Sequence, residues 1–121
     1  MASEGYHEPL EKLSAAVAER HRAIISLKEE LEAVDWYDQR VDASSDNELR
    51  SVLAHNRDEE KEHAAMTLEW LRRNDAKWDE VLHTYLFTSE PIVEVEKEAE
   101  AADAPDTGGL DLGDLREEPP R

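Results

Sequence analysis

Two side chains that could bind a metal ion stand three residues apart in the middle of the chain. Glu60 and His63 form a Glu-x-x-His pattern, and residues at this spacing in a helix lie on one face. A carboxylate can bridge two metal ions while a neutral imidazole binds one of them. Helical bundles with two metal ions use this pattern on two helices and a single Glu on two others. The pair therefore predicts a two-metal site, although the pattern alone is weak because acidic helices produce it by chance.

The register of Glu60 and His63 strengthens the prediction. Steps of seven residues lead from Leu49 to His63, and one step of seven leads from Leu53 to Glu60. Both polar side chains thus occupy a stripe that should be apolar. A buried carboxylate is costly unless it is paired or binds a metal. The alternative interpretation is a hydrogen-bonded polar layer that fixes the register of a bundle.

Glu30 interrupts an apolar row on the preceding helix in the same way. Members of this row share one face through alternating steps of four and three residues. They are Ala23, Leu27, Glu30, Val34, Tyr37 and Val41. Tyr37 lies two turns after Glu30 and could bring its hydroxyl to the same centre. One chain thus supplies one Glu and one Glu-x-x-His, and a two-fold symmetric homodimer would supply the full set for two metal ions.

Two long helices must position these residues. Heptad-spaced leucine, isoleucine and valine residues predict a first helix from Pro9 to about Val41. Residues 42–48 form a turn, in which Ser45 and Glu48 fit a capping box that starts a second helix. That helix should end near residue 73. The side chains expected on its core-facing side are Leu49, Val52, Leu53, Asn56, Glu60, His63, Thr67, Trp70 and Leu71.

The rest of the chain divides by composition. Residues 78–86 predict a short third amphipathic helix, so the helical domain spans residues 8–90 after a flexible leader at 1–7. Residues 91–121 are acidic and proline-rich and contain no aromatic residue, which predicts a disordered tail. Three leucines among glycines at 108–116 are either a docking peptide or a chance cluster.

Composition excludes several classes of function. The 121 residues include 31 acidic and 14 basic side chains, a formal net charge of -17. Nucleic acid and anionic membranes are therefore not expected as partners, because both attract clustered Lys and Arg. The absence of cysteine excludes disulfides and thiolate metal sites. With no signal peptide and no apolar run long enough for a membrane helix, the expected location is the cytoplasm.

Two stretches carry a family resemblance. EELEAVDWYDQR at residues 29–40 and HNRDEEKEHAAMTLEWLRR at residues 55–73 closely resemble the encapsulated ferritins. The resemblance covers about residues 8–90 and also 108–116. It implies an all-α fold in which an antiparallel two-helix hairpin with a short third helix dimerises into a four-helix ferritin-like bundle. It further implies a ring-shaped homodecamer packed inside an encapsulin shell in a bacterial or archaeal cytoplasm.

The resemblance also implies site residues and an activity. The expected activity is that of a ferroxidase, which oxidises Fe(II) to Fe(III) with dioxygen and delivers iron for storage in the shell. Two irons would bind at each dimer interface, although manganese, zinc or calcium can occupy similar sites. The implied di-iron ligands from both chains are Glu30, Glu60 and His63, with Tyr37 nearby as a catalytic residue. An outer site where metal enters maps onto Glu29 and Glu32, with Trp36 close by, and the segment at 108–116 resembles the shell-targeting peptide.

Two other functions remain open at this point. One is a non-enzymatic helical cargo or scaffold module that reaches a shell through the C-terminal peptide. The other is a two-metal enzyme that acts on peroxide. Stoichiometric iron in the purified protein would separate the ferroxidase from the scaffold, and turnover of peroxide would reveal the third.

Overall fold

The computed structural model describes residues 5–103, and in this range it contains helices and no strand. The prediction of an all-α fold is confirmed. Residues 1–4 and 104–121 lie outside the described part, and with them the segment at 108–116. The elements are the 3-10 helix η2 (Leu10–Lys12) and the α-helices α1 (Ala15–Ala43), α2 (Asn47–Arg73), α3 (Ala76–Tyr85) and α4 (Ile92–Asp103).

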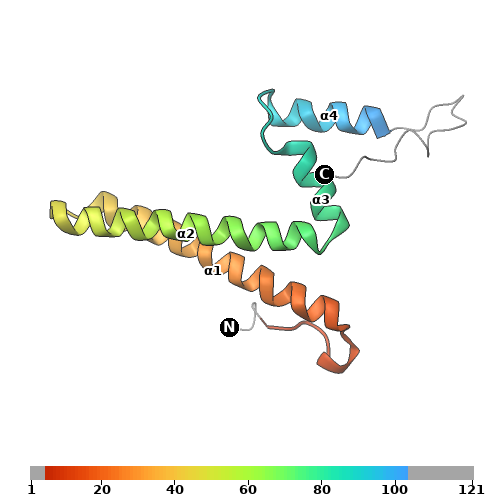
Figure 1. The fold of residues 1–121 in the computed structure, drawn as a ribbon, viewed down its shortest axis with the longest axis horizontal. Coiled ribbons are helices and arrows are strands. Elements are labelled where there is room, and N and C mark those ends of the chain that lie inside the picture. The colour runs from red at the N-terminus through yellow and green to blue at the C-terminus, as the bar shows by residue number, and fades with distance from the viewer. Residues whose placement is uncertain (1–4, 104–121) are drawn as a thin grey trace, which may run out of the picture. The chain divides into compact units, whose positions relative to one another are not determined.

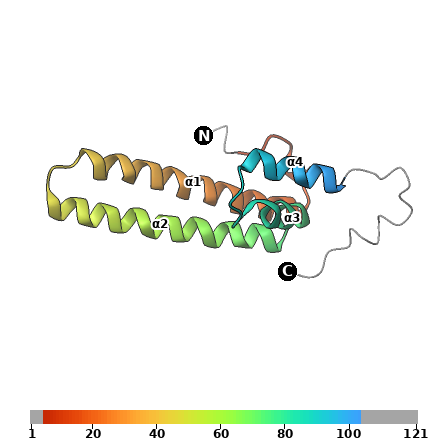
Figure 2. The same cartoon turned by 90° about the horizontal axis from the view of Figure 1, so that it is seen from above.

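Helices α1 and α2 form an antiparallel hairpin, in which the two long helices lie side by side (Figures 1 and 2). Asp46 caps α2, because its side chain accepts a hydrogen bond from the Leu49 backbone N–H at 2.9 Å. The predicted Ser45–Glu48 capping box was therefore placed one residue too early. A carboxylate is well suited to this position, since its charge also interacts favourably with the positive end of the helix dipole.

The first helix begins later than the leucine spacing predicted. Leu10 lies in η2, and α1 starts only after Ser14, whose hydroxyl accepts a hydrogen bond from the Val17 N–H at 3.1 Å. The serine cap explains the break between the two elements. Before η2 the chain folds back, and the Tyr6 ring contacts the His21 ring at a centroid distance of 4.3 Å. The leader is thus attached to α1 at Tyr6.

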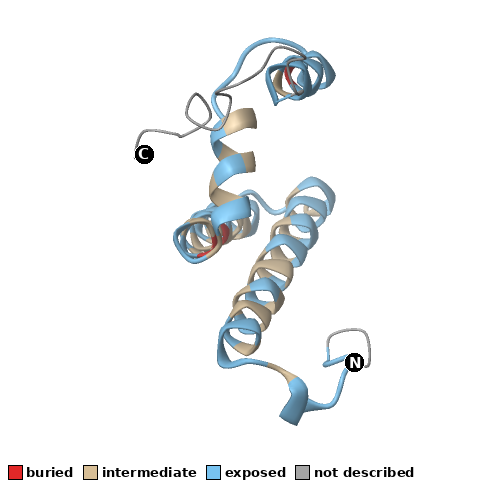
Figure 3. Ribbon diagram, turned by 90° about the vertical axis from the view of Figure 1, so that its right-hand side faces the viewer, coloured by how far each residue is buried: buried red, intermediate tan, exposed pale blue. Residues whose placement is uncertain are grey.

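The hairpin buries few side chains, as the small red areas in Figure 3 show. Ala64 and Leu71 are its only buried residues within the described range, and they lie one heptad apart on α2. The predicted core-facing side was only partly right, because Leu49, Val52 and Trp70 are exposed. These residues lie on a second apolar face of α2, which α1 does not cover.

The chain divides into two compact units, with the boundary between Asp79 and Glu80 inside α3. Helix α3 matches the predicted third helix to within two residues. Helix α4 was not predicted, because residues 91–121 were treated as one disordered segment. Its sequence between Ile92 and Asp103 has no Gly or Pro and consists largely of Glu and Ala, which favour helix, and Pro91 provides its first backbone acceptor. Within residues 5–103, no helix is long and apolar enough to cross a membrane.

Candidate metal centre

Glu30 lies in the middle of α1 and is half-buried. Its Oε1 atom is buried and has no hydrogen-bond partner within the described residues. More than nine in ten buried polar atoms have a partner in folded proteins, so an orphaned carboxylate oxygen needs an explanation. A bound cation is one that the chemistry of a carboxylate supplies directly.

Glu60 and His63 lie together on α2, as their spacing predicted. His63 Nδ1 is 3.5 Å from Glu60 Oε1, and their side chains are 43% and 28% exposed. Thr67, one turn further along, donates its hydroxyl to the His63 carbonyl at 3.1 Å. The pair is thus partly accessible, with a carboxylate and an imidazole close enough to share one metal ion.

The described part of a single chain does not bring a complete set of metal ligands together. In residues 5–103 no three His, Asp or Glu side chains converge closely enough to hold a metal ion. Glu30 and the Glu60–His63 pair therefore do not form one metal-binding group within the described part of a single chain. The prediction that two chains complete it is not tested by one chain alone.

Tyr37 is half-buried on α1, two turns after Glu30. The guanidinium carbon of Arg40 lies 5.4 Å from the centre of its ring, close enough for a cation–π interaction. This contact restrains the ring of Tyr37 against α1. It leaves the approach of the hydroxyl to a metal as a prediction.

The three residues assigned to the outer site are on the surface of α1. Glu29 and Glu32 are exposed, and Trp36 is 51% exposed. In a helix, steps of three and four residues place these side chains on one face. The face is accessible to cations from solvent.

An ionic contact that the sequence did not predict joins α1 to α2 near Trp36. Arg57 donates from Nη1 to Asp38 Oδ1 at 2.9 Å and from Nε to Asp58 Oδ1 at 3.1 Å. Both contacts raise the pKa of Arg57, and the guanidinium lowers the pKa of Asp58. A signal was available, since steps of seven back from Leu71 lead through Ala64 to Arg57 and place it on the side that faces α1.

A second ionic cluster lies at the end of α2. Glu69 accepts two hydrogen bonds from Arg72 and one from Arg73, each at 2.7 Å, and Arg72 also binds Asp79 at the start of α3. The two arginines lower the pKa of Glu69 to about 2. Arg20 of α1 adds a longer contact of 3.8 Å to Asp75. These contacts link the end of α2 to Asp75 and Asp79 within the first unit.

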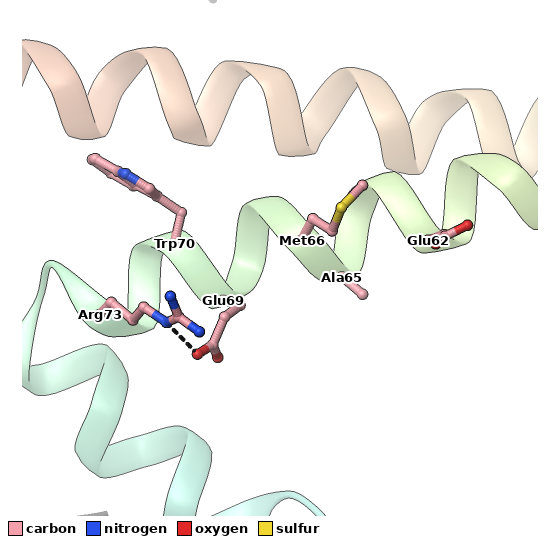
Figure 4. A pocket seen from close by; sticks show the side chains of 6 residues that line it. All are labelled: Glu62, Ala65, Met66, Glu69, Trp70 and Arg73. Atoms are coloured by element: carbon pink, nitrogen blue, oxygen red, sulfur yellow. Dashed lines mark hydrogen bonds and ion pairs between the residues drawn. The ribbon is translucent and has the colours of Figure 1, made fainter.

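The surface of α2 also carries a shallow groove, shown in Figure 4. Met66 and Trp70 project from the same side of the helix there, and they are 58% and 39% exposed. The complete lining consists of Glu62, Ala65, Met66, Glu69, Trp70 and Arg73. Steps of seven residues lead from Leu49 to Trp70 and from Val52 to Met66, so the groove lies on the same face of α2 as Leu49 and Val52.

Known proteins match this chain along most of its length. The "Encapsulated ferritin-like protein" of Rhodospirillum rubrum is 58% identical over 136 aligned residues, which cover 99% of this chain and 97% of the relative. The "Encapsulin nanocompartment cargo protein EncC" of Myxococcus xanthus is 34% identical over 104 residues, or 76% of this chain and 80% of the relative.

A solved structure and a family model agree with these relatives. The crystal structure of protein ne0167 from Nitrosomonas europaea is similar with a TM-score of 0.70 and 64% identity, covering 73% of this chain and 97% of that chain. The sequence model of the EncFtn-like family matches residues 5–89. The resemblance to encapsulated ferritins is confirmed, and the chain belongs to the EncFtn-like family.

Proposed function

We propose that this protein is a ferroxidase, which oxidises Fe(II) to Fe(III) with dioxygen at a two-iron site formed where two copies of the chain meet. The observation that carries the proposal is the buried oxygen of Glu30, which has no hydrogen-bond partner in the described chain. An unsatisfied buried polar atom costs about 1–3 kcal/mol, so its retention calls for a compensating function. Family membership makes a metal ligand the most direct function.

The donor set fits iron. Glu60 and His63 offer a carboxylate and an imidazole 3.5 Å apart, and Glu30 offers a second carboxylate. Carboxylate and Glu-x-x-His ligands on facing helices are the set that di-iron bundles use. Because anionic oxygen donors favour the higher charge, they stabilise Fe(III) relative to Fe(II). Each of the two irons would give up one electron, so that one dioxygen would be reduced by two electrons to the level of peroxide.

A second copy of the chain is needed because one chain supplies only part of the ligand set. One chain supplies half of the ligand set, and a two-fold axis between two chains would supply two copies of Glu30, Glu60 and His63. The hairpin also leaves much apolar surface uncovered for such contact. The large exposed apolar residues on α1 and α2 include Val17, Ile24, Leu31, Leu49, Val52, Met66 and Trp70. We also propose that Tyr37 lies close to the paired site and acts as a catalytic residue. The dimers would assemble further into a ring-shaped decamer.

Iron reaches the site from an acidic surface in this proposal. The net charge of -17 raises the local concentration of cations. Glu29 and Glu32 are exposed beside Trp36 and offer a first binding site for Fe(II). From there the ion moves to the site between the chains.

We further propose that the protein works as cargo inside an encapsulin shell in a bacterial or archaeal cytoplasm, where the oxidised iron is stored. The names of the Rhodospirillum and Myxococcus relatives support this role, since one is called encapsulated and the other an encapsulin nanocompartment cargo. The leucine-containing segment at 108–116 would bind the shell. Deleting residues 108–121 should prevent co-purification with a co-expressed shell protein and leave iron oxidation unchanged.

The ferroxidase is tested with matched variants of α2. Glu60→Ala and His63→Ala should reduce aerobic Fe(II) oxidation, followed by ferric absorbance and oxygen consumption, to the rate of buffer alone. Glu62→Ala is the control, because Glu62 is exposed on the same helix. Wild-type rates in both ligand variants would exclude the proposed site. A protein purified from iron-rich culture without stoichiometric iron would instead favour the scaffold function.

A further inference from the structure

Arg57 places a positive charge one turn from a proposed metal ligand. It lies on the row that continues through Ala64 and Leu71, so it is on the side of α2 that faces α1, and its side chain is 23% exposed. Glu60 follows three residues later. Residues at this spacing are neighbours on a helix surface, and an arginine and a glutamate placed there readily form an ion pair.

Such a pair would interfere with metal binding at Glu60. A guanidinium would occupy the carboxylate oxygens through charge-assisted hydrogen bonds and would repel an approaching cation. Arg72 shows that this pairing occurs elsewhere on α2, where it binds Glu69 across the same three-residue spacing. At Glu60, however, the recorded side-chain contact is with His63.

Two aspartates account for the difference. The Arg57 guanidinium donates to Asp38 on α1 and to Asp58 on α2, at 2.9 and 3.1 Å. Asp58 also lies 3.6 Å from Lys61, the other basic residue beside Glu60. Both cations next to the ligand are thus bound by carboxylates that are not proposed ligands.

We propose that Asp38 and Asp58 are positioning residues that hold Arg57 away from Glu60 and keep this carboxylate available to metal. The proposal rests on the proposed function, since it takes Glu60 to be a ligand. The contact between Arg57 and Asp38 would then have two roles. It links α1 with α2, and it keeps the carboxylate of Glu60 free for a metal ion. Arg57 is then a potential competitor of the metal, and the aspartates control it.

Zinc binding to metal-free full-length protein tests the proposal without redox chemistry. In the double variant Asp38→Asn/Asp58→Asn, the zinc affinity of the site should fall about fivefold for each chain that contributes ligands. This factor corresponds to the free energy of one exposed ion pair that competes with zinc. Adding Arg57→Gln and Lys61→Gln to this variant, which removes both cations beside Glu60, should restore the wild-type affinity. The single variant Asp38→Asn should also bind zinc more weakly than the wild type, but by a smaller factor. Glu69→Gln is the matched control, because it removes a carboxylate that Arg72 and Arg73 share farther along α2.

Arg57→Gln alone separates competition from a merely structural contact. Competition predicts zinc affinity equal to or above wild type, whereas loss of a structural contact would weaken binding as much as the aspartate variants do. A weakened Arg57→Gln, or aspartate variants with wild-type affinity, would overturn the proposal. Glu60→Ala distinguishes this failure from failure of the proposed function. Unchanged zinc affinity in Glu60→Ala would show that Glu60 is no ligand and would remove both proposals together.

Discussion

Replacing Glu30 by methionine should stabilise the metal-free protein and remove its response to metal. The Oε1 atom of Glu30 is buried without a hydrogen-bond partner in the described chain. Leaving such a group unsatisfied costs about 1–3 kcal/mol, and methionine has a similar length without the polar atoms. The metal-free variant should therefore gain about 1–3 kcal/mol. For a domain of roughly 100 residues, each kcal/mol raises the melting temperature by about 4–8 °C.

Thermal unfolding followed by circular dichroism measures this change. The wild type and Glu30→Met are compared with a chelator and with excess zinc, at one protein concentration because assembly also shifts the apparent stability. Zinc should raise the melting temperature of the wild type and leave that of the variant unchanged. Glu62→Met is the control, since this exposed residue is not a proposed ligand and its replacement should change stability by no more than about 0.5 kcal/mol.

Two results would refute this reasoning. A metal-free Glu30→Met that melts well below the wild type would show that the carboxylate stabilises the fold by itself. Zinc stabilisation of equal size in both proteins would show that Glu30 does not bind the metal. The first result removes the argument from the orphaned oxygen, and the second removes Glu30 from the site.

The remaining predictions concern the hairpin. Leu71→Ala, at a fully buried position, should lower the free energy of unfolding in urea by about 2–5 kcal/mol, against less than about 1 kcal/mol for exposed Val93→Ala. Asp46→Ala should cost about 1 kcal/mol through loss of the α2 cap, while Ser45→Ala should be nearly neutral in the same assay. The pKa of Glu69 falls from 4.5 to about 2 on folding, so its ion pairs stabilise the protein above pH 4.5 and are lost as the pH drops from 4.5 towards 2. Glu69→Gln should weaken this acid dependence in melting curves recorded between those two values.

The sequence predicts helices better than their faces. The end of α2 at Arg73 and the short α3 follow from periodicity and from the breaks around them. The face of α2 that α1 covers could not be predicted, because the helix has two apolar sides and periodicity does not say which one is internal. Leu71 was predicted to face the core, but Arg57 and Ala64 on the same row were not, because that row begins with a charge.

The same distinction applies to the site. Glu60 and His63 are close because helix geometry alone relates residues three apart, and this part was predictable. The contact between Asp38 and Arg57 joins residues 19 positions apart, so it depends on the register of two helices. Helix α4 was missed for another reason, since the prolines and glycines of the surrounding tail obscured the strong helix formers between Ile92 and Asp103.

The near absence of internal burial in the described residues would, in the proposed dimer, make the stability of the protein depend on how many copies are present. Ala64, Leu71 and Val95 are the only buried side chains in the described range. If contacts between copies supply the missing burial, mass action ties the folded population to the amount of protein made. A newly synthesised copy is then most open to proteases until it meets another. Excess monomers would be degraded, whereas dimerised chains would persist.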